Sequence, residues 1–485
     1  SEDVGLRTPE IHRALAAMSA SGRIDAAEAD AMVKAYRFLR RLINGLRMLR
    51  GNAGDLEVPE DQDSAFSVLA GRIGYPPPDD SQGPHPLQVD LEETRAQVRA
   101  FVERHLGPDA LPPLTEPGVA DLLFATHVDH QRVGSTLGAA GFAQPDRAWR
   151  NLTGILRRAG DQQLAGRLLL MAIPVLVRDG EPDEALNRLE QLLGSVPDPS
   201  AFMTRLTSHR RELELLLRLI GASAFLAEVI QRSPEDFSWA SSPTQVQRAR
   251  GVPRLERNLA ELAGPSEMPG TARGHSDVEE RSAAVALSRA HWLNVIRRFR
   301  NRELLRIGIR DLVLRVPLAT VTAEISDLAE AILRSTLVRL WDRMDRLGRL
   351  AGADPEDFAA RCTILGFGKL GARELNYSSD IDLVMVYRPE NQSDPAIYER
   401  AMREVIADLS DFTPEGFCYR VDIRLRPYGT ASPAALSVDA LRDYYRESAR
   451  DWELQAVLRA RALAGNRDLG RSVIQQLRGI VQRRL

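Results

Sequence analysis

The sequence predicts a mainly helical protein that contains a small α+β core toward its C-terminal end. Two observations support this fold class. Most of the chain before Asp357 is typical of helices, and in segments such as 25–50 and 321–347 apolar residues recur at every third or fourth position, which is the period of an amphipathic helix. After Asp357 the pattern changes to short apolar runs with the spacing and composition of strands. Short strands beside long helices favour an α+β core within an otherwise helical protein.

Composition narrows the class of protein further. At ~100–200 residues per domain, the 485 residues predict roughly three domains. The 64 Lys and Arg residues nearly balance the 67 Asp and Glu residues, whereas a general nucleic-acid binder is usually strongly basic, so we expect no nucleic-acid partner. The sequence has no run of ~18 apolar residues, and we expect no membrane span. The two cysteines, Cys362 and Cys418, provide no disulfide framework and suit a reducing cytoplasm.

The first third of the chain is predicted to be helical with two breaks. A long amphipathic helix covers Asp25–Arg50, with its apolar residues on one stripe. The segment Tyr75–Pro86 is too rich in proline to continue a helix, and a further helix is predicted at Asp90–His105. A second Pro- and Gly-rich break at Gly107–Gly118 is predicted to be the first domain boundary.

The middle of the chain is predicted to be a helical core. The strongly apolar segment Leu164–Val177 contains a proline and predicts a buried, kinked helix that is too short to span a membrane. The segment Glu212–Ile230 predicts two core helices that meet near Gly221–Ser223. A polar loop at Ala263–Asp277 precedes two further predicted helices, at Ser276–Asp311 and Val321–Leu347.

Three strands are predicted after Asp357. They cover Cys362–Phe367, Ile381–Tyr387 and Phe417–Leu425, and the third shows alternation of apolar and polar residues. The first two strands enclose the most informative stretch of the sequence, LGFGKLGARELNYSSDIDLVMVY. The glycines Gly366, Gly368 and Gly371 follow the first strand, where their small size would let backbone approach a phosphate closely.

An Asp-x-Asp pair begins the second predicted strand. Asp380 and Asp382 are two residues apart, so on a strand their side chains would share one face. Two adjacent carboxylates repel each other unless a cation lies between them. Mg²⁺ prefers such hard oxygen ligands and commonly completes its shell with substrate phosphates.

A third acid lies on the third predicted strand, in the segment YRVDIRLRP. Asp422 lies between Val421 and Ile423, and an acid in so apolar a run requires a partner or a metal ion. Period-two spacing would place Arg424 and Arg426 on the same face as Asp422. Two interpretations stay open: Arg424 forms a structural ion pair with Asp422 or Asp382, or the arginines bind phosphate bidentately.

The glycine turn, the Asp pair and the third Asp together predict a metal-dependent phosphoryl or nucleotidyl transfer site. In such a site two Mg²⁺ ions bridged by carboxylates stabilise both the attacking and the leaving oxygen. Positioning and charge stabilisation would then be most of the contribution of the protein.

At these residues the sequence resembles the nucleotidyltransferase superfamily. The segments GFGKLGARELNYSSDIDLVMVY, YRVDIRLRPYG and RDWELQAVLRARALAGNRDLG resemble, in the same order, motifs of the glutamine synthetase adenylyltransferase / adenylyl-removing enzyme family. A weaker likeness extends back to about Val119. The resemblance implies a nucleotidyltransferase catalytic domain with a short mixed sheet, embedded between helical bundles.

The resemblance also implies ligands and roles. Asp380, Asp382 and Asp422 would be the Mg²⁺ ligands, and two ions are expected. The nucleotide phosphates would be lined by Gly368, Lys369, Gly371 and Ser379, and Arg424 and Arg426 match the RLRP run of the family. The implied partners are glutamine synthetase, ATP or ADP with phosphate, and a PII signal protein.

The family carries two similar catalytic halves, one of which adds AMP to a tyrosine of glutamine synthetase while the other removes it by phosphorolysis. Only one catalytic core is present in this chain, so we expect one half of a longer tandem protein, or a rearranged member. The segments NYSSDID and YYRESARDWELQA favour the adenylyl-removing half. Residues 22–50 resemble the bundle that normally follows a catalytic core, and their position ahead of one favours the adenylylating half.

The predicted organisation divides the chain into seven parts. They are a helical bundle segment (1–106), a linker (107–118), a helical domain (119–262), a flexible loop (263–277), helices that lead into the core (278–356), the catalytic core (357–470) and the start of a further helical segment (471–485). Two alternative functions stay open: uridylylation of a PII-type protein, and a non-catalytic regulatory helical module.

Overall fold

The computed structural model describes residues 11–50, 57–60, 63–77, 84–107, 118–125, 128–178, 180–264, 278–429 and 432–484. The chain divides into two compact units, Ser1–Gln231 and Arg232–Leu485, here called unit 1 and unit 2. The division falls inside the predicted helical domain 119–262. Most of the predicted linker 107–118 and of the predicted loop 263–277 lies outside the described residues.

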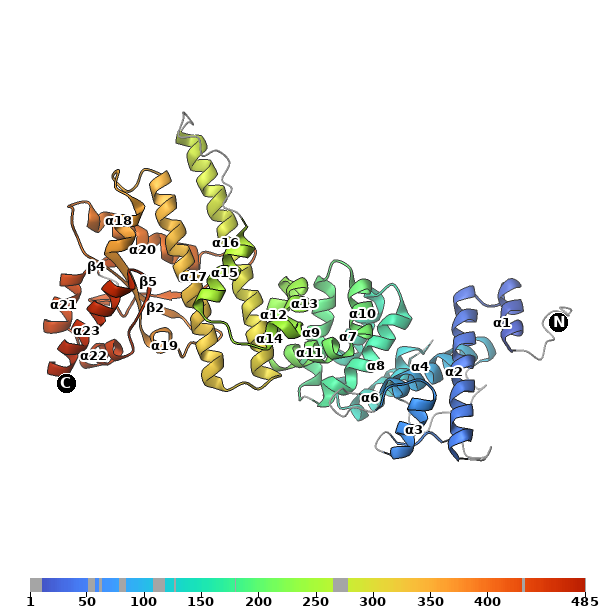
Figure 1. The fold of residues 1–485 in the computed structure, drawn as a ribbon. Coiled ribbons are helices and arrows are strands. Elements are labelled where there is room, and N and C mark those ends of the chain that lie inside the picture. The colour runs from blue at the N-terminus through green and yellow to red at the C-terminus, as the bar shows by residue number, and fades with distance from the viewer. Residues whose placement is uncertain are drawn as a thin grey trace. The chain divides into compact units, whose positions relative to one another are not determined.

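Unit 1 is helical throughout its described ranges (Figure 1). Its helices are α1 (Ile11–Ala20), α2 (Ala26–Arg50), α3 (Ser64–Arg72), α4 (Pro86–Leu106), α5 (Val119–Leu123), α6 (His130–Ala139), α7 (Pro145–Arg158), α8 (Gln162–Arg178), α9 (Pro182–Ser195), α10 (Pro199–Ser208), α11 (Arg210–Ala222) and α12 (Ala224–Arg232).

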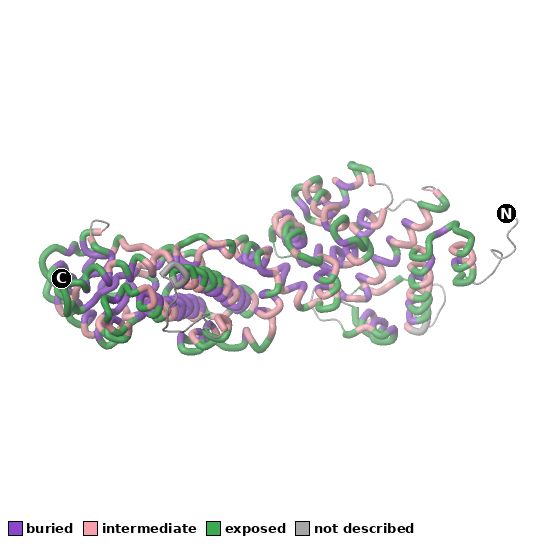
Figure 2. Tube along the Cα trace, turned by 90° about the horizontal axis from the view of Figure 1, so that it is seen from above, coloured by how far each residue is buried: buried purple, intermediate pink, exposed green. Residues whose placement is uncertain are grey.

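The helices of unit 1 follow the predicted apolar stripes. Buried residues, purple in Figure 2, occur along the helices of both units. Helix α8 contains Pro174 and is buried over most of its length, as its apolar sequence predicts. Helices α11 and α12 meet at Ser223, which confirms the predicted break near Gly221–Ser223.

Unit 2 combines helices with a small mixed sheet. Its helices are α13 (Pro234–Ser241), α14 (Pro243–Val246), α15 (Val252–Ala263), α16 (Val278–Leu312), α17 (Leu318–Arg346), α18 (Pro355–Arg361), α19 (Gly368–Gly371), α20 (Asp394–Ser410), α21 (Val438–Glu447), α22 (Asp451–Leu458) and α23 (Arg467–Arg484). Its strands are β1 (Cys362–Gly366), β2 (Ile381–Tyr387), β3 (Val421–Asp422), β4 (Ala435–Ser437) and β5 (Arg461–Gly465).

The sheet has the order β3-β2-β1-β5, with β4 also paired to β2. Strand β1 is antiparallel to both β2 and β5, whereas β2 is parallel to β3 and β4. The mainly helical fold with a short mixed sheet confirms the predicted fold class. The third predicted strand was too long: Phe417–Leu425 contributes only Val421–Asp422, because the chain turns immediately after Asp422.

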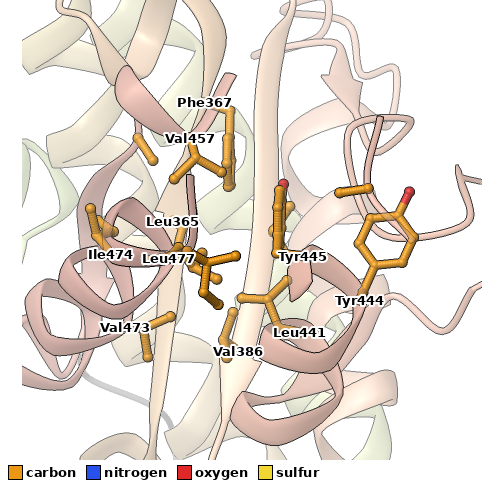
Figure 3. Close-up of a cluster of buried hydrophobic side chains, with 14 of the residues drawn as sticks. Leu365, Phe367, Val386, Leu441, Tyr444, Tyr445, Val457, Val473, Ile474 and Leu477 are labelled. Atoms are coloured by element: carbon orange, nitrogen blue, oxygen red, sulfur yellow. The ribbon is translucent and has the colours of Figure 1, made fainter. Parts of the chain in front are cut away.

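An apolar core joins one face of the sheet to the C-terminal helices. Leu365 of β1 and Val386 of β2 pack with Leu441 of α21, Val457 of α22 and Leu477 of α23 (Figure 3). In Figure 1 these helices lie on one side of the sheet and α17 lies on the other. Residues 471–485, predicted to begin a further helical segment, therefore belong mostly to a helix that covers the sheet of the core.

Both cysteines are buried and unbridged. Within the described ranges, no helix combines the length and the apolar character needed to cross a membrane.

Candidate active site

Two acids meet where β2 and β3 begin to pair. The parallel register sets Asp382 directly opposite Asp422, and Ile381 opposite Val421. Asp380 lies immediately before β2, where the Ile381 N–H donates to the Arg420 carbonyl at 3.0 Å. The structure thus brings Asp382 and Asp422 together from positions forty residues apart in the chain.

The charged form of the Asp382 carboxyl is destabilised in this arrangement, and its pKa is raised. The pKa of Asp382 is raised to about 6, first by burial and then by the neighbouring Asp422 and Asp380 carboxylates, whereas Arg424 and Lys369 act to lower it. Its carboxylate accepts no hydrogen bond from the described residues. Such a half-buried carboxylate beside two others favours a cation nearby.

The other two acids are paired with arginines. The Arg424 side chain donates to both Asp422 carboxylate oxygens, at 3.1 Å from Nε to Oδ1 and 2.6 Å from Nη2 to Oδ2. The Arg424 N–H also donates to Asp422 at 2.7 Å, which closes the turn that ends β3. These hydrogen bonds from Arg424 lower the pKa of Asp422. Arg420 donates to Asp380 at 2.5 Å from Nε.

Sequence reasoning missed Arg420, although it stands two residues before Asp422 and so shares its period-two position. Of the two predicted interpretations of Arg424, its contacts match the ion pair with Asp422. Arg426 lies elsewhere: because the strand ends at Asp422, its side chain is buried and donates to the Gly429 carbonyl at 2.8 Å.

The glycine turn lies against the acids. Gly368 has φ +55°, and a Cβ there would collide with the Asp382 carboxylate, so both backbone conformation and space require glycine. The Phe367 N–H donates to the Asp382 carbonyl at 3.0 Å, which joins the turn to β2. Lys369 is exposed, and its Nζ lies 3.5 Å from the Ser379 hydroxyl.

Hydrogen bonds to α17 hold the segment that follows the glycine turn. The Ser326 hydroxyl accepts the Leu375 N–H at 3.1 Å, and Asp327 accepts a hydrogen bond from Arg373 at 2.7 Å. Arg461 of β5 pairs with the buried Glu330 of α17, and it donates to the carbonyls of Leu370 at 3.2 Å and Gly371 at 3.3 Å. The turn is therefore fixed to α17 and β5 as well as to β2.

We expect Gly371→Ala to destabilise unit 2 by about 1–3 kcal/mol, because the new Cβ would collide with the Arg459 carbonyl oxygen and lie 2.6 Å from that of Gly366. Backbone cannot move aside as a flexible side chain can. Urea unfolding followed by tryptophan fluorescence measures the loss. Gly479→Ala in α23 is the control: its Cβ meets only Arg483 Nη1 at 3.9 Å, and we expect a gain of about 0.5–1 kcal/mol. Equal effects of the two substitutions would contradict the packing argument.

The donor set fits a divalent cation chemically. Two carboxylates on adjacent strands and a third immediately before β2 supply the hard oxygen ligands that Mg²⁺ prefers. In the arrangement described, however, Arg420 and Arg424 are bonded to Asp380 and Asp422. Among the described residues, no group of three or more His, Cys, Asp and Glu side chains has the spacing to hold a metal ion. A cation bound by these acids would therefore compete with Arg420 and Arg424 for their carboxylate oxygens.

Two family models match parts of the chain. The model of the glutamate-ammonia ligase adenylyltransferase family matches residues 213–476, which is more than half of the chain. The model of GlnD PII-uridylyltransferase matches residues 7–106.

Curated relatives of the chain are described as adenylyltransferases, as is the family of the first of these models. The chain is 28% identical over 491 residues to a bifunctional glutamine synthetase adenylyltransferase/adenylyl-removing enzyme of Xanthobacter autotrophicus, covering 96% of this chain and 45% of that protein. It is 35% identical over 281 residues to the enzyme of the same description from Hahella chejuensis, covering 56% of this chain and 27% of that protein. The chain thus spans about half the length of the relatives that it matches along most of its own length. The chain belongs to the glutamate-ammonia ligase adenylyltransferase family.

Proposed function

We propose that unit 2 carries out Mg²⁺-dependent nucleotidyl transfer that sets the adenylylation state of glutamine synthetase. The single observation that carries the proposal is the register that opposes Asp382 to Asp422 beside the Gly368 turn, in a chain of this family. The names of the curated relatives supply the substrate. The metal ligands would be Asp380, Asp382 and Asp422, and bound Mg²⁺, two ions by the family resemblance, would supply charge stabilisation to the reacting phosphate.

The residues of the glycine turn would bind the nucleotide phosphates. The absence of a side chain at Gly368 leaves the turn backbone open beside Asp382. Lys369 and Ser379 stand next to each other at the same edge, so the ammonium and the hydroxyl could hold phosphate oxygens there. Arg424 would balance negative charge at Asp422 before substrate binds.

We favour removal of AMP over its addition. In that reaction an oxygen of inorganic phosphate attacks the AMP phosphorus and the bond to the tyrosine oxygen breaks. The tyrosine oxygen takes up a proton, and ADP leaves. The segments NYSSDID and YYRESARDWELQA support this direction by resemblance.

The adenylylating half is the second candidate. It is supported by the helical bundle ahead of the catalytic core, which includes residues 22–50 and lies within the matched range 7–106. That match also supports a PII-type protein as a regulatory partner and keeps uridylylation as a further alternative.

A paired assay tests the direction. The chain and Mg²⁺ are mixed with adenylylated glutamine synthetase and phosphate in one reaction, and with unmodified synthetase and ATP in another. We expect ADP release in the first reaction only. Incorporation of AMP in the second reaction only would assign the adenylylating half, and a preference for UTP with a PII-type protein would favour uridylylation. No transfer in any reaction by a folded chain would refute the proposal.

A further inference from the structure

The loop between α20 and β3 presents an exposed aromatic side chain, Phe412. Phe412 is 77% exposed, and its ring lies 5.9 Å from that of Phe417. One exposed phenylalanine is ordinary on a protein surface. What distinguishes Phe412 is the buried structure that holds its loop.

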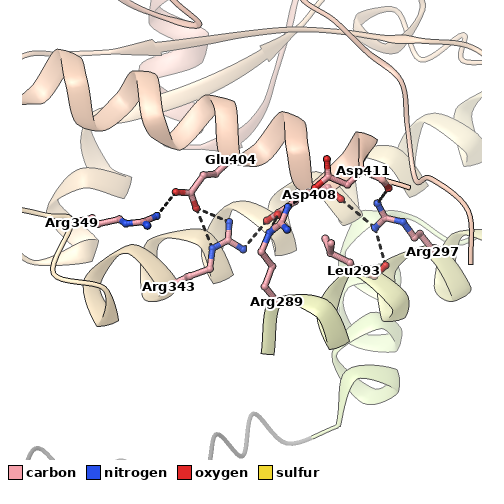
Figure 4. A network of polar contacts seen from close by, with 8 residues as sticks. All are labelled: Arg289, Leu293, Arg297, Arg343, Arg349, Glu404, Asp408 and Asp411. Carbon is pink, nitrogen blue, oxygen red and sulfur yellow. Dashed lines mark hydrogen bonds and ion pairs between the residues drawn. The ribbon is translucent and has the colours of Figure 1, made fainter. Parts of the chain in front are cut away.

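A buried arginine fixes the backbone on both sides of Phe412. The Arg297 side chain of α16 is fully buried and donates to the Asp411 carbonyl just before Phe412 (Figure 4). The same side chain donates to the Gly416 carbonyl just after the turn, at 2.8 Å. It also donates to the carbonyls of Asp408 at 3.2 Å and Leu293 at 2.9 Å. All four acceptors are backbone carbonyls, and two of them, Asp411 and Gly416, belong to this loop, so the buried guanidinium joins the loop to α16 and to the end of α20.

Side-chain ion pairs add to this support. Arg289 binds the Asp411 carboxylate at 2.8 Å and the buried Asp408 at 2.6 Å, and Arg343 of α17 also binds Asp408 at 2.8 Å. The turn itself is closed by hydrogen bonds between Thr413 and Gly416 in both directions. The loop that carries Phe412 is therefore anchored to α16, and through Asp408 to α17.

Arg420 links the pair of rings, Phe412 and Phe417, to the acids. The Arg420 guanidinium carbon lies 5.9 Å from the centre of the Phe417 ring, and the same side chain donates to Asp380 at 2.5 Å. A chain of contacts thus leads from Phe412 through Phe417 and Arg420 to the carboxylates.

We propose that Phe412 and Phe417 form a docking surface for the protein substrate, and that they receive an apolar side chain of the substrate segment that carries the modified residue. The proposal rests on the proposed function, which requires a side chain of another protein to reach the acids. An exposed aromatic side chain on a loop already held in place loses little conformational freedom on binding, which favours affinity. A nucleotide would be bound by its phosphates at the glycine turn and would not need these rings.

The test compares Phe412→Ala with Leu287→Ala, a matched removal of a 74% exposed apolar side chain from α16. The KM for glutamine synthetase, in whichever direction the wild-type chain works, is measured beside the Kd for ATP with Mg²⁺. For Phe412→Ala we expect KM to rise about tenfold with an unchanged nucleotide Kd, which is the size of one truncated interface contact. Leu287→Ala should leave both constants unchanged.

Three results would overturn the docking surface: an unchanged KM in Phe412→Ala, an equal rise in Leu287→Ala, or a matching loss of nucleotide affinity. Direct binding of glutamine synthetase to the immobilised chain separates this proposal from the proposed function. If the wild-type chain binds the synthetase without catalysis and Phe412→Ala weakens binding, the docking surface stands and the proposed function fails. If the wild-type chain does not bind the synthetase, the docking surface is refuted.

Discussion

Replacing Asp382 with asparagine is expected to lower the rate of nucleotidyl transfer by about a hundredfold to a thousandfold, which is the loss typical of removing one electrostatic contact to the reacting group. The substitution keeps the size of the side chain and removes one of the three negative charges that the proposed ions require. Initial rates of ADP release or AMP incorporation at saturating Mg²⁺ measure the effect.

The same substitution is expected to raise the melting temperature in Mg²⁺-free buffer. The pKa of Asp382 is raised to about 6 by burial and by Asp422 and Asp380, so its charged form destabilises the fold near neutral pH. Asparagine has no charge to repel its neighbours. A variant that loses activity while it gains stability cannot owe the lost activity to unfolding.

Asp439→Asn is the control for this pair of measurements. Asp439 lies in the first turn of α21, is largely exposed and pairs with Arg442 at 2.6 Å. Because exposed pairs contribute little, we expect its rate and its melting temperature to remain close to those of the wild-type chain. Full activity of a folded Asp382→Asn variant would show that the acids are not the catalytic site.

The second large effect is expected for Glu303→Ala, which should reduce the free energy of unfolding of unit 2 by about 3–5 kcal/mol. Glu303 is fully buried and pairs with Arg250 and, at 2.7 Å, with the fully buried Arg306. Glu324 of α17 accepts from Arg306 at 2.7 Å and from Arg310 at 2.8 Å. Removing Glu303 leaves more buried positive charge than Glu324 can balance.

Urea unfolding followed by tryptophan fluorescence measures this loss, because four of the five tryptophans, Trp239, Trp292, Trp341 and Trp452, belong to unit 2. Glu235→Ala is the control: its pair with Arg298 of α16 is exposed, so we expect a change below about 0.5 kcal/mol. A loss of less than 1 kcal/mol for Glu303→Ala would mean that the buried pairs are dispensable for stability.

The sequence predicted the strands that are continuous apolar runs. Strand β2 has the predicted bounds Ile381–Tyr387, and β1 ends one residue before the predicted Phe367. Strand β5, Arg461–Gly465, was not predicted, because its alanines and arginine carry little strand propensity and its pairing with β1 decides the conformation.

In the candidate site, too, contacts that local sequence does not reveal decide part of the structure. Alternation along Phe417–Leu425 predicted that Asp422, Arg424 and Arg426 share a face, but the Asp422 carboxylate captures the Arg424 N–H and ends the strand. Local patterning therefore identified the acids, whereas the positions of the arginines depend on one hydrogen bond that competes with strand pairing. The Arg420 contact with Asp380 depends on the β2–β3 register, which periodicity alone does not provide.

The middle position of β1 has a consequence for how the chain folds during synthesis. Strand β1 is completed only when β5 pairs with it, and β5 emerges from the ribosome about one hundred residues later. Until then β1 has one unpaired edge, and the carbonyls of Leu370 and Gly371 lack the Arg461 side chain that binds them. Because this pairing is so distant in sequence, we expect the glycine turn to be one of the last parts of unit 2 to reach its final geometry. A nascent chain that stops short of Arg461 should therefore expose an aggregation-prone strand edge.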